Sequence, residues 1–337
     1  MNILQNISLK HYNTFGVDVN AKYFAEYNSE DELRELLLSD IVKCNRYLHI
    51  GGGSNLLFLN DFDGIIMHSA IKSIEIASED NDYVYVRVGA GTVWDDFVEY
   101  CVTHHWYGVE NLSLIPGEVG ASAVQNIGAY GMEVKDTIEA VEAIEIETLT
   151  RKTFTNQDCQ YDYRNSIFKT KFKNQYVITF VTFKLKKTPT FKLEYQHLNA
   201  SVIQRGEVNL RNVRNTIISI REEKLPNPSV MGNAGSFFMN PIISTKKWNE
   251  LSVNYPSMPH YNISQTEEKI PAGWLIEQCG FKGKQFENVG VHKNQALVIV
   301  NLGNASGKEI VALAELIQST VKQRFDIDIL PEVNYIG

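Results

Sequence analysis

Three consecutive glycines constrain this chain more than any other feature of its sequence. They stand in Ile50–Asn55 (IGGGSN), directly after the apolar run Tyr47–Ile50, which is typical of a strand. A backbone without Cβ atoms can adopt positive φ and turn its N–H groups inward as a nest for an anion, typically a phosphate pair. Ser54 and Asn55 add side-chain donors that could cap a following turn. The same residues also fit a tight strand-to-turn connection without a ligand.

A second glycine-rich stretch favours the phosphate interpretation. Residues 107–131 crowd Gly108, Gly117, Gly120, Gly128 and Gly131 into a segment with little periodicity. A long irregular loop in a compact domain is usually either functional or disordered. This one also carries several apolar side chains, too many for disorder, so we expect a packed binding loop.

The remaining patterns mix helices and strands without a steady βαβ rhythm, which predicts an α+β fold. Capping boxes at Ser29/Glu32 and Ser306/Glu309 predict two helix starts, and Thr92 with Asp95 predicts a third. Alternating or apolar runs predict strands. The expected helices lie at 92–104, 210–222, 272–278 and 306–324, and the expected strands at 47–50, 64–67, 83–88, 138–149, 176–185 and 296–301.

Composition narrows the class of protein. The 337 residues carry a net charge of −8, so we expect no nucleic-acid partner. The histidines and cysteines show no metal-ligand spacing, which predicts no metal site, and the absence of C-x-x-C favours reduced thiols of an intracellular protein. We see no signal peptide and no apolar run of about 18 residues, so we expect a cytoplasmic protein without membrane insertion.

Four further blocks follow the glycine loop in a fixed order. They are Ile115–Gly131 (IPGEVGASAVQNIGAYG), Tyr161–Phe168 (YDYRNSIF), Gly232–Pro241 (GNAGSFFMNP) and Leu330–Val333 (LPEV), with shorter matches at Ala272–Glu277 and Val291–Ala296. From about Asn13 to the C-terminus, the chain resembles the UDP-N-acetylenolpyruvoylglucosamine reductase family, also called UDP-N-acetylmuramate dehydrogenases. These are flavoenzymes of peptidoglycan precursor synthesis.

The resemblance implies a domain organisation. It predicts an FAD-binding fold of the vanillyl-alcohol-oxidase type over residues 1–224, in two subdomains split near residue 70. A smaller α+β substrate-binding domain would cover 225–325, and 326–337 would be a strand that returns to the active site. Phe191–Tyr195 resembles the extra segment of the longer subtype, which supplies a substrate-binding tyrosine.

The implied reaction reduces an enolpyruvyl double bond, with hydride passing from flavin N5 to the β-carbon. Arg164 would hold the carboxylate and stabilise the enolate, because a guanidinium binds a carboxylate bidentately and stays charged. Glu332, if protonated or sharing a proton, would hydrogen-bond the enolate, and Ser236 would protonate the α-carbon. The alternatives are a structural ion pair for Arg164, a solvated strand residue for Glu332 and a turn-capping role for Ser236.

The resemblance also implies binding residues. For non-covalent FAD they are Gly51, Gly52, Gly53, Ser54, Asn55, Ile115, Gly117, Ser122, Asn126, Gly128 and Tyr130. For UDP-N-acetylglucosamine enolpyruvate they are Tyr163, Tyr195, Lys224, Asn240 and Gln295. Lys224 could instead be a basic residue that meets the dipole at the end of a helix.

The co-substrate NADPH is implied by the family. No G-x-G-x-x-G follows a strand, so we expect NADPH and the UDP-sugar to use one cleft in turn, with ping-pong kinetics. We expect a monomer.

Two positions depart from the family pattern. Asn334 stands where many members carry Arg, and Glu118 places an acid in the flavin loop.

Two other functions stay open. An oxidase of the same fold that reoxidises its flavin with O2 is one alternative, although 51–55 and 115–131 hold no His or Cys for tethering FAD. A non-catalytic nucleotide-binding module, which would need none of Arg164, Ser236 and Glu332, is the other.

Overall fold

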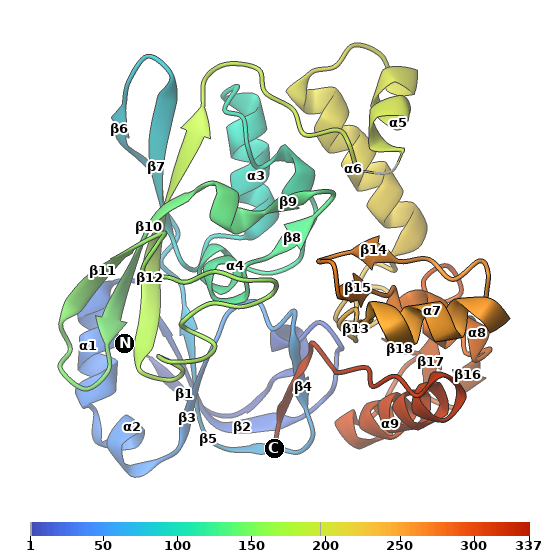
Figure 1. Ribbon diagram of the computed structural model, residues 1–337. Coiled ribbons are helices and arrows are strands. Elements are labelled where there is room, and N and C mark those ends of the chain that lie inside the picture. The colour runs from blue at the N-terminus through green and yellow to red at the C-terminus, as the bar shows by residue number, and fades with distance from the viewer. Residues whose placement is uncertain (1, 196) are drawn as a thin grey trace. The chain divides into compact units, whose positions relative to one another are not determined.

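The computed structural model describes residues 2–195 and 197–337, and these form two compact units (Figure 1). Unit 1 comprises residues 2–7, Ala21–Gly52 and Asp63–Arg221. Unit 2 comprises Ser8–Asn20, Gly53–Phe62 and Glu222–Gly337. Strands and helices are interspersed in both, which confirms the α+β class.

The units are discontinuous in sequence. The main change of unit, at Arg221/Glu222, lies close to the boundary expected after residue 224. However, residues 8–20 and 53–62, expected in the first domain, group with the C-terminal part, and so do residues 326–337. The assignment of one domain to FAD and another to the substrate stays a prediction.

A four-stranded sheet in unit 1 carries the first glycine loop. Its order is β1-β2-β5-β3, and β3 runs parallel to β5. Helices α1 and α2 pack on it through Leu33, Leu36 and Val42. The bounds are β1 Ile3–Ser8, β2 Asn20–Tyr27, β3 Tyr47–Ile50, β5 Phe62–Ser69, α1 Glu30–Leu38 and α2 Asp40–Cys44. The strand expected at 47–50 and the Ser29 cap of α1 are confirmed.

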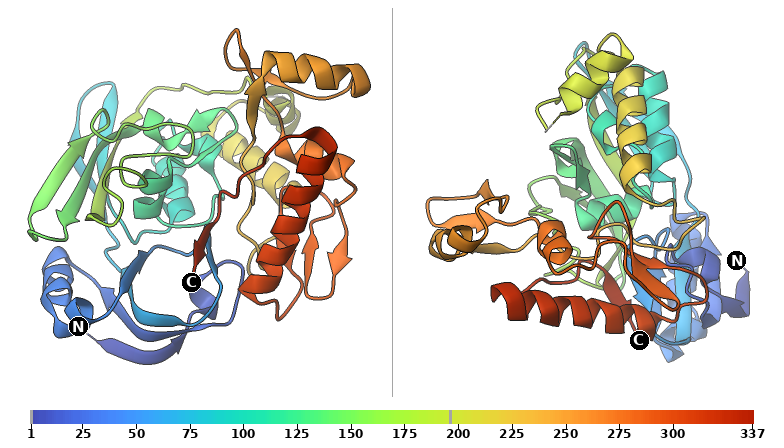
Figure 2. Two further views of the ribbon diagram at one scale, coloured as in Figure 1. Left: turned by 60° about the horizontal axis from the view of Figure 1, so that its bottom comes forward. Right: turned by 90° about the vertical axis from the view of Figure 1, so that its right-hand side faces the viewer.

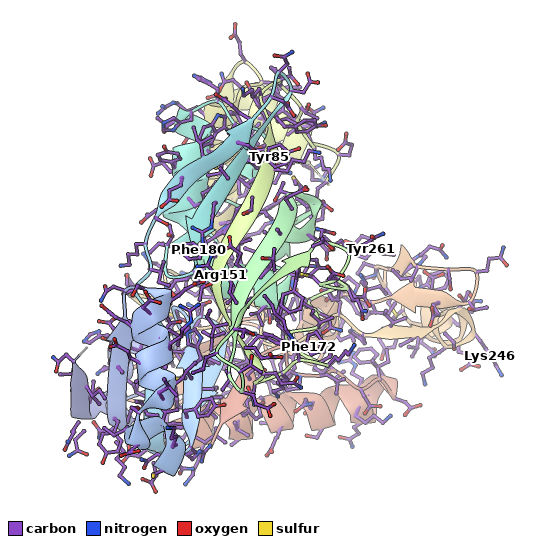
Figure 3. The ribbon with its side chains drawn as sticks, turned by 90° about the vertical axis from the view of Figure 1, so that its left-hand side faces the viewer. Tyr85, Arg151, Phe172, Phe180, Lys246 and Tyr261 are labelled. Atoms are coloured by element: carbon purple, nitrogen blue, oxygen red, sulfur yellow. The ribbon has the colours of Figure 1, made fainter. Side chains whose placement is uncertain are left out.

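An antiparallel five-stranded sheet, in the order β11-β10-β12-β7-β6, forms the other part of unit 1. Its inner face packs against Trp94 and Phe97 of α3 and Ala123 of α4. Its outer face carries Tyr85 and Phe180, with the Arg87 guanidinium 3.3 Å from the Phe180 ring centre (Figure 3). The bounds are β6 Ile74–Glu79, β7 Tyr83–Gly89, β10 Ile138–Glu145, β11 Arg151–Thr155, β12 Tyr176–Lys186, α3 Trp94–Thr103 and α4 Val119–Gln125.

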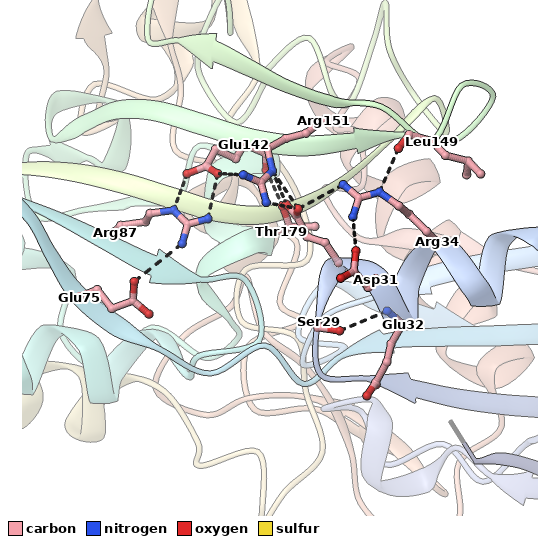
Figure 4. A network of polar contacts seen from close by, with 11 residues as sticks. Ser29, Asp31, Glu32, Arg34, Glu75, Arg87, Glu142, Leu149, Arg151 and Thr179 are labelled. Atoms are coloured by element: carbon pink, nitrogen blue, oxygen red, sulfur yellow. Dashed lines mark hydrogen bonds and ion pairs between the residues drawn. The ribbon is translucent and has the colours of Figure 1, made fainter.

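A polar network joins α1 to this sheet (Figure 4). The Glu30 carboxylate accepts hydrogen bonds from Arg151 and from the Thr179 hydroxyl at 2.7 Å. Arg87 donates to Glu142 through Nε and Nη2, at 2.6 and 2.9 Å. Burial by itself would raise the pKa of Glu30, but the bonds from Arg151 and Thr179 and the charge of Arg34 hold it below its ordinary value. The network therefore stabilises the junction of the two sheets of unit 1.

Two helices complete unit 1, α5 Leu198–Arg205 and α6 Leu210–Lys224, whose last residues enter unit 2. Leu198, Val202, Val213 and Ile217 form their shared core, and Tyr130 packs against it.

Unit 2 contains two three-stranded sheets and a short parallel pair of strands. The pair is formed by β4 and the C-terminal β19, and these two strands lie side by side in Figures 1 and 2. Helix α9 begins with the expected Ser306/Glu309 capping box and buries Ile310, Ile317 and Val321. The helix bounds are α7 Thr245–Asn254, α8 Ala272–Gln278 and α9 Gly307–Phe325. The strand bounds are β4 Leu56–Phe58, β13 Ile242–Ser244, β14 Tyr261–Asn262, β15 Glu267–Lys269, β16 Gln285–Phe286, β17 Val289–Val291, β18 Ile299–Asn301 and β19 Asn334–Ile336.

Candidate functional site

The two glycine-rich stretches lie against each other in unit 1. A Cβ on Gly52 would stand 3.3 Å from the Gly117 Cα, and one on Gly51 would stand 3.2 Å from the Ala121 Cβ. Of the three glycines, only Gly53 uses the freedom to adopt positive φ, at 63°. At Gly51 and Gly52 the reason for glycine is close approach of the second loop. A backbone cradle that a Cβ would fill is what a phosphate-binding loop requires, so these residues fit FAD.

The second loop is more regular than the sequence suggests, because it contains α4. The Ser122 hydroxyl donates to Val119 O at 2.7 Å, within the helix. Asn126 ends the helix in the left-handed conformation, and its buried side chain donates to Asp162 O and accepts from Lys135 N. Hence the side chains of Ser122 and Asn126 shape the loop.

The Tyr161–Phe168 block is bonded directly to this loop. Arg164 has a left-handed backbone, with φ 54°, in a tight turn where Asp162 pairs with Asn165. Its guanidinium donates to Gly128 O and, at 3.3 Å, to Asn126 O. The Tyr163 ring, which is exposed, lies 5.2 Å from the same guanidinium. The structure therefore brings Arg164, Tyr163, Asn126 and Gly128 together.

Two further predicted tyrosines of this unit also meet. The rings of Tyr130 and Tyr195 are 5.8 Å apart in an edge-on arrangement, and Asn111 donates to Tyr130 O at 2.9 Å. Burial raises the pKa of the Tyr130 hydroxyl. Arg221, a neighbour of Tyr130 that we did not predict, donates to Leu114 O at 3.2 Å.

A second unpredicted feature is an ion pair beneath the loop. Asp95 does not form a helix cap with Thr92, because α3 begins after Val93 with no side-chain cap. Instead its carboxylate accepts from both Nη atoms of Arg214, at 2.6 and 2.9 Å, and from Leu114 N. The signal that could have shown it is Arg214 on the apolar side of the expected 210–222 helix, next to Val213.

Unit 2 brings together the segments that carry Ser236 and Glu332. Their segments pair: Glu332 N donates to Phe237 O at 2.8 Å, Met239 N donates to Leu330 O at 2.9 Å, and Phe238 bridges to Pro331. Ser236 is exposed and Glu332 half-buried, whereas Phe237 and Phe238 are fully buried. Main-chain bonds and two buried phenylalanines thus hold these two segments together.

The Gly53–Asn55 end of the first loop is bonded to the same segment. Asn55 Nδ2 donates to Glu332 O at 3.1 Å, and Asn334 N donates to Asn55 O at 3.0 Å. Asn334, the departure from the expected Arg, adds a weaker contact from its Nδ2 to the same oxygen at 3.3 Å. Ser54, the residue before Asn55, is half-buried.

The predicted substrate residues of unit 2 have different surroundings. Lys224 lies next to the 292–295 segment, because Asn294 Nδ2 donates to Glu223 O at 2.8 Å. Gln295 Oε1 accepts from Leu297 N at 3.3 Å within this segment. Asn240 Oδ1 accepts from Ala272 N at 2.9 Å, which ties it to the start of α8.

Two kinds of feature are absent from residues 2–195 and 197–337. No group of three or more His, Cys, Asp or Glu side chains is placed to hold a metal ion. No helix in these ranges is long and apolar enough to cross a membrane.

Known proteins resemble this chain over its whole length. A model of the UDP-N-acetylenolpyruvoylglucosamine reductase C-terminal domain matches residues 227–336, and an FAD-binding domain model matches 21–148. The reductase of Bacteroides fragilis strain YCH46 is 54% identical over 332 residues, which cover 98% of this chain and 99% of the relative. The reductase of Porphyromonas gingivalis strain W83 is 48% identical over 338 residues, the full length of both.

The crystal structure of the Thermus caldophilus reductase shares the fold, with a TM-score of 0.70 at 21% identity over 100% of this chain and 98% of that one. This shared fold agrees with the full-length sequence matches. The chain therefore belongs to the UDP-N-acetylenolpyruvoylglucosamine reductase family of FAD-dependent oxidoreductases.

Proposed function

We propose that this protein uses NADPH to reduce the enolpyruvyl group of UDP-N-acetylglucosamine enolpyruvate, giving UDP-N-acetylmuramate for peptidoglycan synthesis. The observation that carries the proposal is the pairing of the Ser236 and Glu332 segments, supported by relatives that bear the reductase name at 54% and 48% identity. A nucleotide-binding module would have no need of this paired arrangement. FAD, when bound, supplies the hydride.

The residues of the chain have distinct roles in this proposal. Arg164, fixed by its bonds to loop carbonyls, binds the substrate carboxylate and stabilises negative charge as it develops. Glu332 shares a proton with the enolate oxygen. Ser236, exposed on its buried base, donates a proton to the α-carbon.

Tyr163, Tyr195, Lys224, Asn240 and Gln295 bind the rest of the UDP-sugar in this proposal. Because Asn240 Oδ1 is bonded to Ala272 N, Asn240 acts by placing α8 or through its amide nitrogen. NADPH occupies the UDP-sugar cleft in turn. A monomeric state and a cytoplasmic location stay predictions.

The test follows the flavin. The protein should purify yellow, and acid precipitation should leave the flavin in the supernatant. Anaerobic NADPH should bleach the flavin band, and the enolpyruvyl sugar should restore it. Flavin retained in the pellet or rapid recovery with O2 alone would indicate an oxidase, and no bleaching by NADPH would indicate a non-catalytic module.

A further inference from the structure

Glu118 is an acid inside the loop proposed to bind the FAD diphosphate. Its side chain is buried, with 8% of the residue exposed. One oxygen, Oε2, lies 3.3 Å from where a Cβ on Gly51 would stand, and Glu118 Cγ lies 3.9 Å from where a Cβ on Gly52 would stand. The carboxylate therefore lies beside the backbone of the first glycine loop, where an isolated negative charge would oppose a diphosphate.

The other oxygen of Glu118 contacts His68 in β5. His68 Nε2 is 2.8 Å from Glu118 Oε1, and His68 Nδ1 is 2.9 Å from Glu26 Oε1 of β2. A neutral imidazole has one N–H donor, whereas an imidazolium has two. With both carboxylates ionised, only the imidazolium satisfies both contacts.

Two neighbouring titratable groups, His49 and Tyr27, are neutral. Burial, and then the charge of His68, lowers the pKa of His49 in β3 to about 3. Tyr27 in β2 lies 2.6 Å from His49 Nε2, and burial raises the pKa of its hydroxyl well above the ordinary value. His68 thus faces the carboxylates of Glu118 and Glu26. Burial by itself would lower the pKa of His68, but the bonds to these two acids raise it.

We propose that His68 is a positioning residue for the FAD-binding loop: held between Glu118 and Glu26, its imidazolium turns Glu118 toward β5 and cancels its charge, so that the glycine loops accept a diphosphate. The inference rests on the proposed placement of FAD at these loops. In this arrangement FAD binding depends on one proton, that of the His68 imidazolium. When His68 loses that proton, the Glu118 carboxylate is uncompensated and repels the diphosphate, so affinity falls.

Proton linkage sets the direction and the size of the change in FAD affinity with pH. Because the pKa of His68 is raised in the folded protein, the favourable state is fully present at low pH and is lost as pH rises through that raised pKa. One linked proton weakens FAD binding by at most about tenfold per pH unit above it. Binding in that range should also take up a proton.

The experiment measures FAD dissociation constants of the apo-protein by flavin fluorescence between about pH 6 and pH 9.5, the range in which a histidine with a raised pKa titrates. The parent should weaken as pH rises, and Glu118→Gln should bind FAD with little pH dependence. His68→Gln should bind FAD about tenfold or more weakly than the parent at pH 6, the effect of losing one compensating charge, and with little pH dependence, so that the two proteins converge as pH rises. The double variant should regain affinity, because the penalty arises from the Glu118 charge.

Controls separate charge from folding. Riboflavin, which has no phosphate, should show no such dependence, and Glu35→Gln, an exposed acid of α1, should behave as the parent. The proposal is wrong if Glu118→Gln keeps the parent pH profile, if riboflavin shows the same profile, or if the double variant binds as weakly as His68→Gln. If His68→Gln does not fold, the Glu118→Gln profile still decides. A Gly52→Val variant that retains FAD would instead overturn the placement of FAD.

Discussion

The side-chain amide of Asn55 donates a hydrogen bond to the main-chain carbonyl of Glu332, at 3.1 Å, across 277 residues of sequence. This bond joins the end of the first glycine loop to the segment that carries Glu332, the residue proposed to hydrogen-bond the enolate. Parallel pairing of β4 with β19 continues the same connection. Two parts of the proposed site that are remote in sequence are thus fixed to one another within unit 2.

Gly52→Val should yield protein without FAD. A Cβ at this position meets the Gly117 backbone at 3.3 Å, and the two methyl groups of Val would force the loops apart. Gly52→Ala, with only the Cβ, should lose part of the flavin. Flavin absorbance per protein gives the occupancy, and circular dichroism checks folding. A folded Val variant with full occupancy would contradict the cradle.

Ser236→Ala should separate the two half-reactions. Reduction of the flavin by NADPH needs no proton on a substrate carbon, whereas reduction of the enolpyruvyl group needs one. Positioned acid catalysis is typically worth roughly 10²–10⁴-fold, so flavin bleaching should stay normal and reoxidation by the sugar should fall by about that factor. Stopped-flow absorbance follows each step.

A Cys at this position tests the acid role further. Ser236→Cys should recover part of the second step, since a thiol can also donate a proton. Reoxidation of Ser236→Ala near the parent rate would make the residue structural. Equal slowing of both steps would point instead to a role in placing the flavin or the shared cleft.

Lys224→Ala and Tyr195→Phe should weaken binding of the UDP-sugar and leave FAD content unchanged. A Lys paired with a phosphate contributes charge, and removal of one charge-assisted hydrogen bond costs about 1.5–3 kcal/mol, or roughly 10- to 150-fold in affinity. Isothermal titration with the sugar measures the effect. Lys246→Ala, an exposed cation of α7, is the matched control (Figure 3). Loss of FAD in Lys224→Ala would assign that residue to the flavin site.

Steady-state kinetics should show one cleft used in turn. Parallel double-reciprocal plots are expected when NADPH and the UDP-sugar alternate, and excess sugar should inhibit by excluding NADPH. Intersecting lines would indicate a ternary complex and a second nucleotide site.

Asp95→Asn should destabilise the protein by about 3 kcal/mol at neutral pH, because it removes the two-point ion pair of the buried Arg214 guanidinium and leaves it with the Glu99 carboxylate at 3.8 Å. Burial by itself would raise the pKa of Asp95, but the bonds from Arg214 and Leu114 N hold it below its ordinary value. Because folding lowers the pKa of Asp95, the ion pair stabilises the protein fully at pH values above the unfolded-state pKa. This stabilisation is lost as the pH falls through the folded-state pKa. Urea denaturation should therefore show the difference from the parent shrinking in acid. Asp96→Asn, exposed on the same helix, should have little effect.

The sequence by itself determined the family, because seven ordered blocks over nearly the whole chain form a specific pattern. It also determined most elements, since periodicity and capping are local: α8 at 272–278 and β3 at 47–50 lie where expected. The caps at Ser29 and Ser306 were predictable for the same reason.

Only the tertiary structure decided which side chains meet. Asp95 matched a cap locally, yet Arg214, 119 residues away, outcompetes that role with a two-point ion pair. Positive φ was possible at each glycine of the triplet, but the second loop decided that Gly52 is needed for close approach. Glu118 was an unexplained acid until β5 supplied His68. Local preferences are encoded in neighbouring residues, whereas these contacts depend on packing between segments that no local pattern specifies.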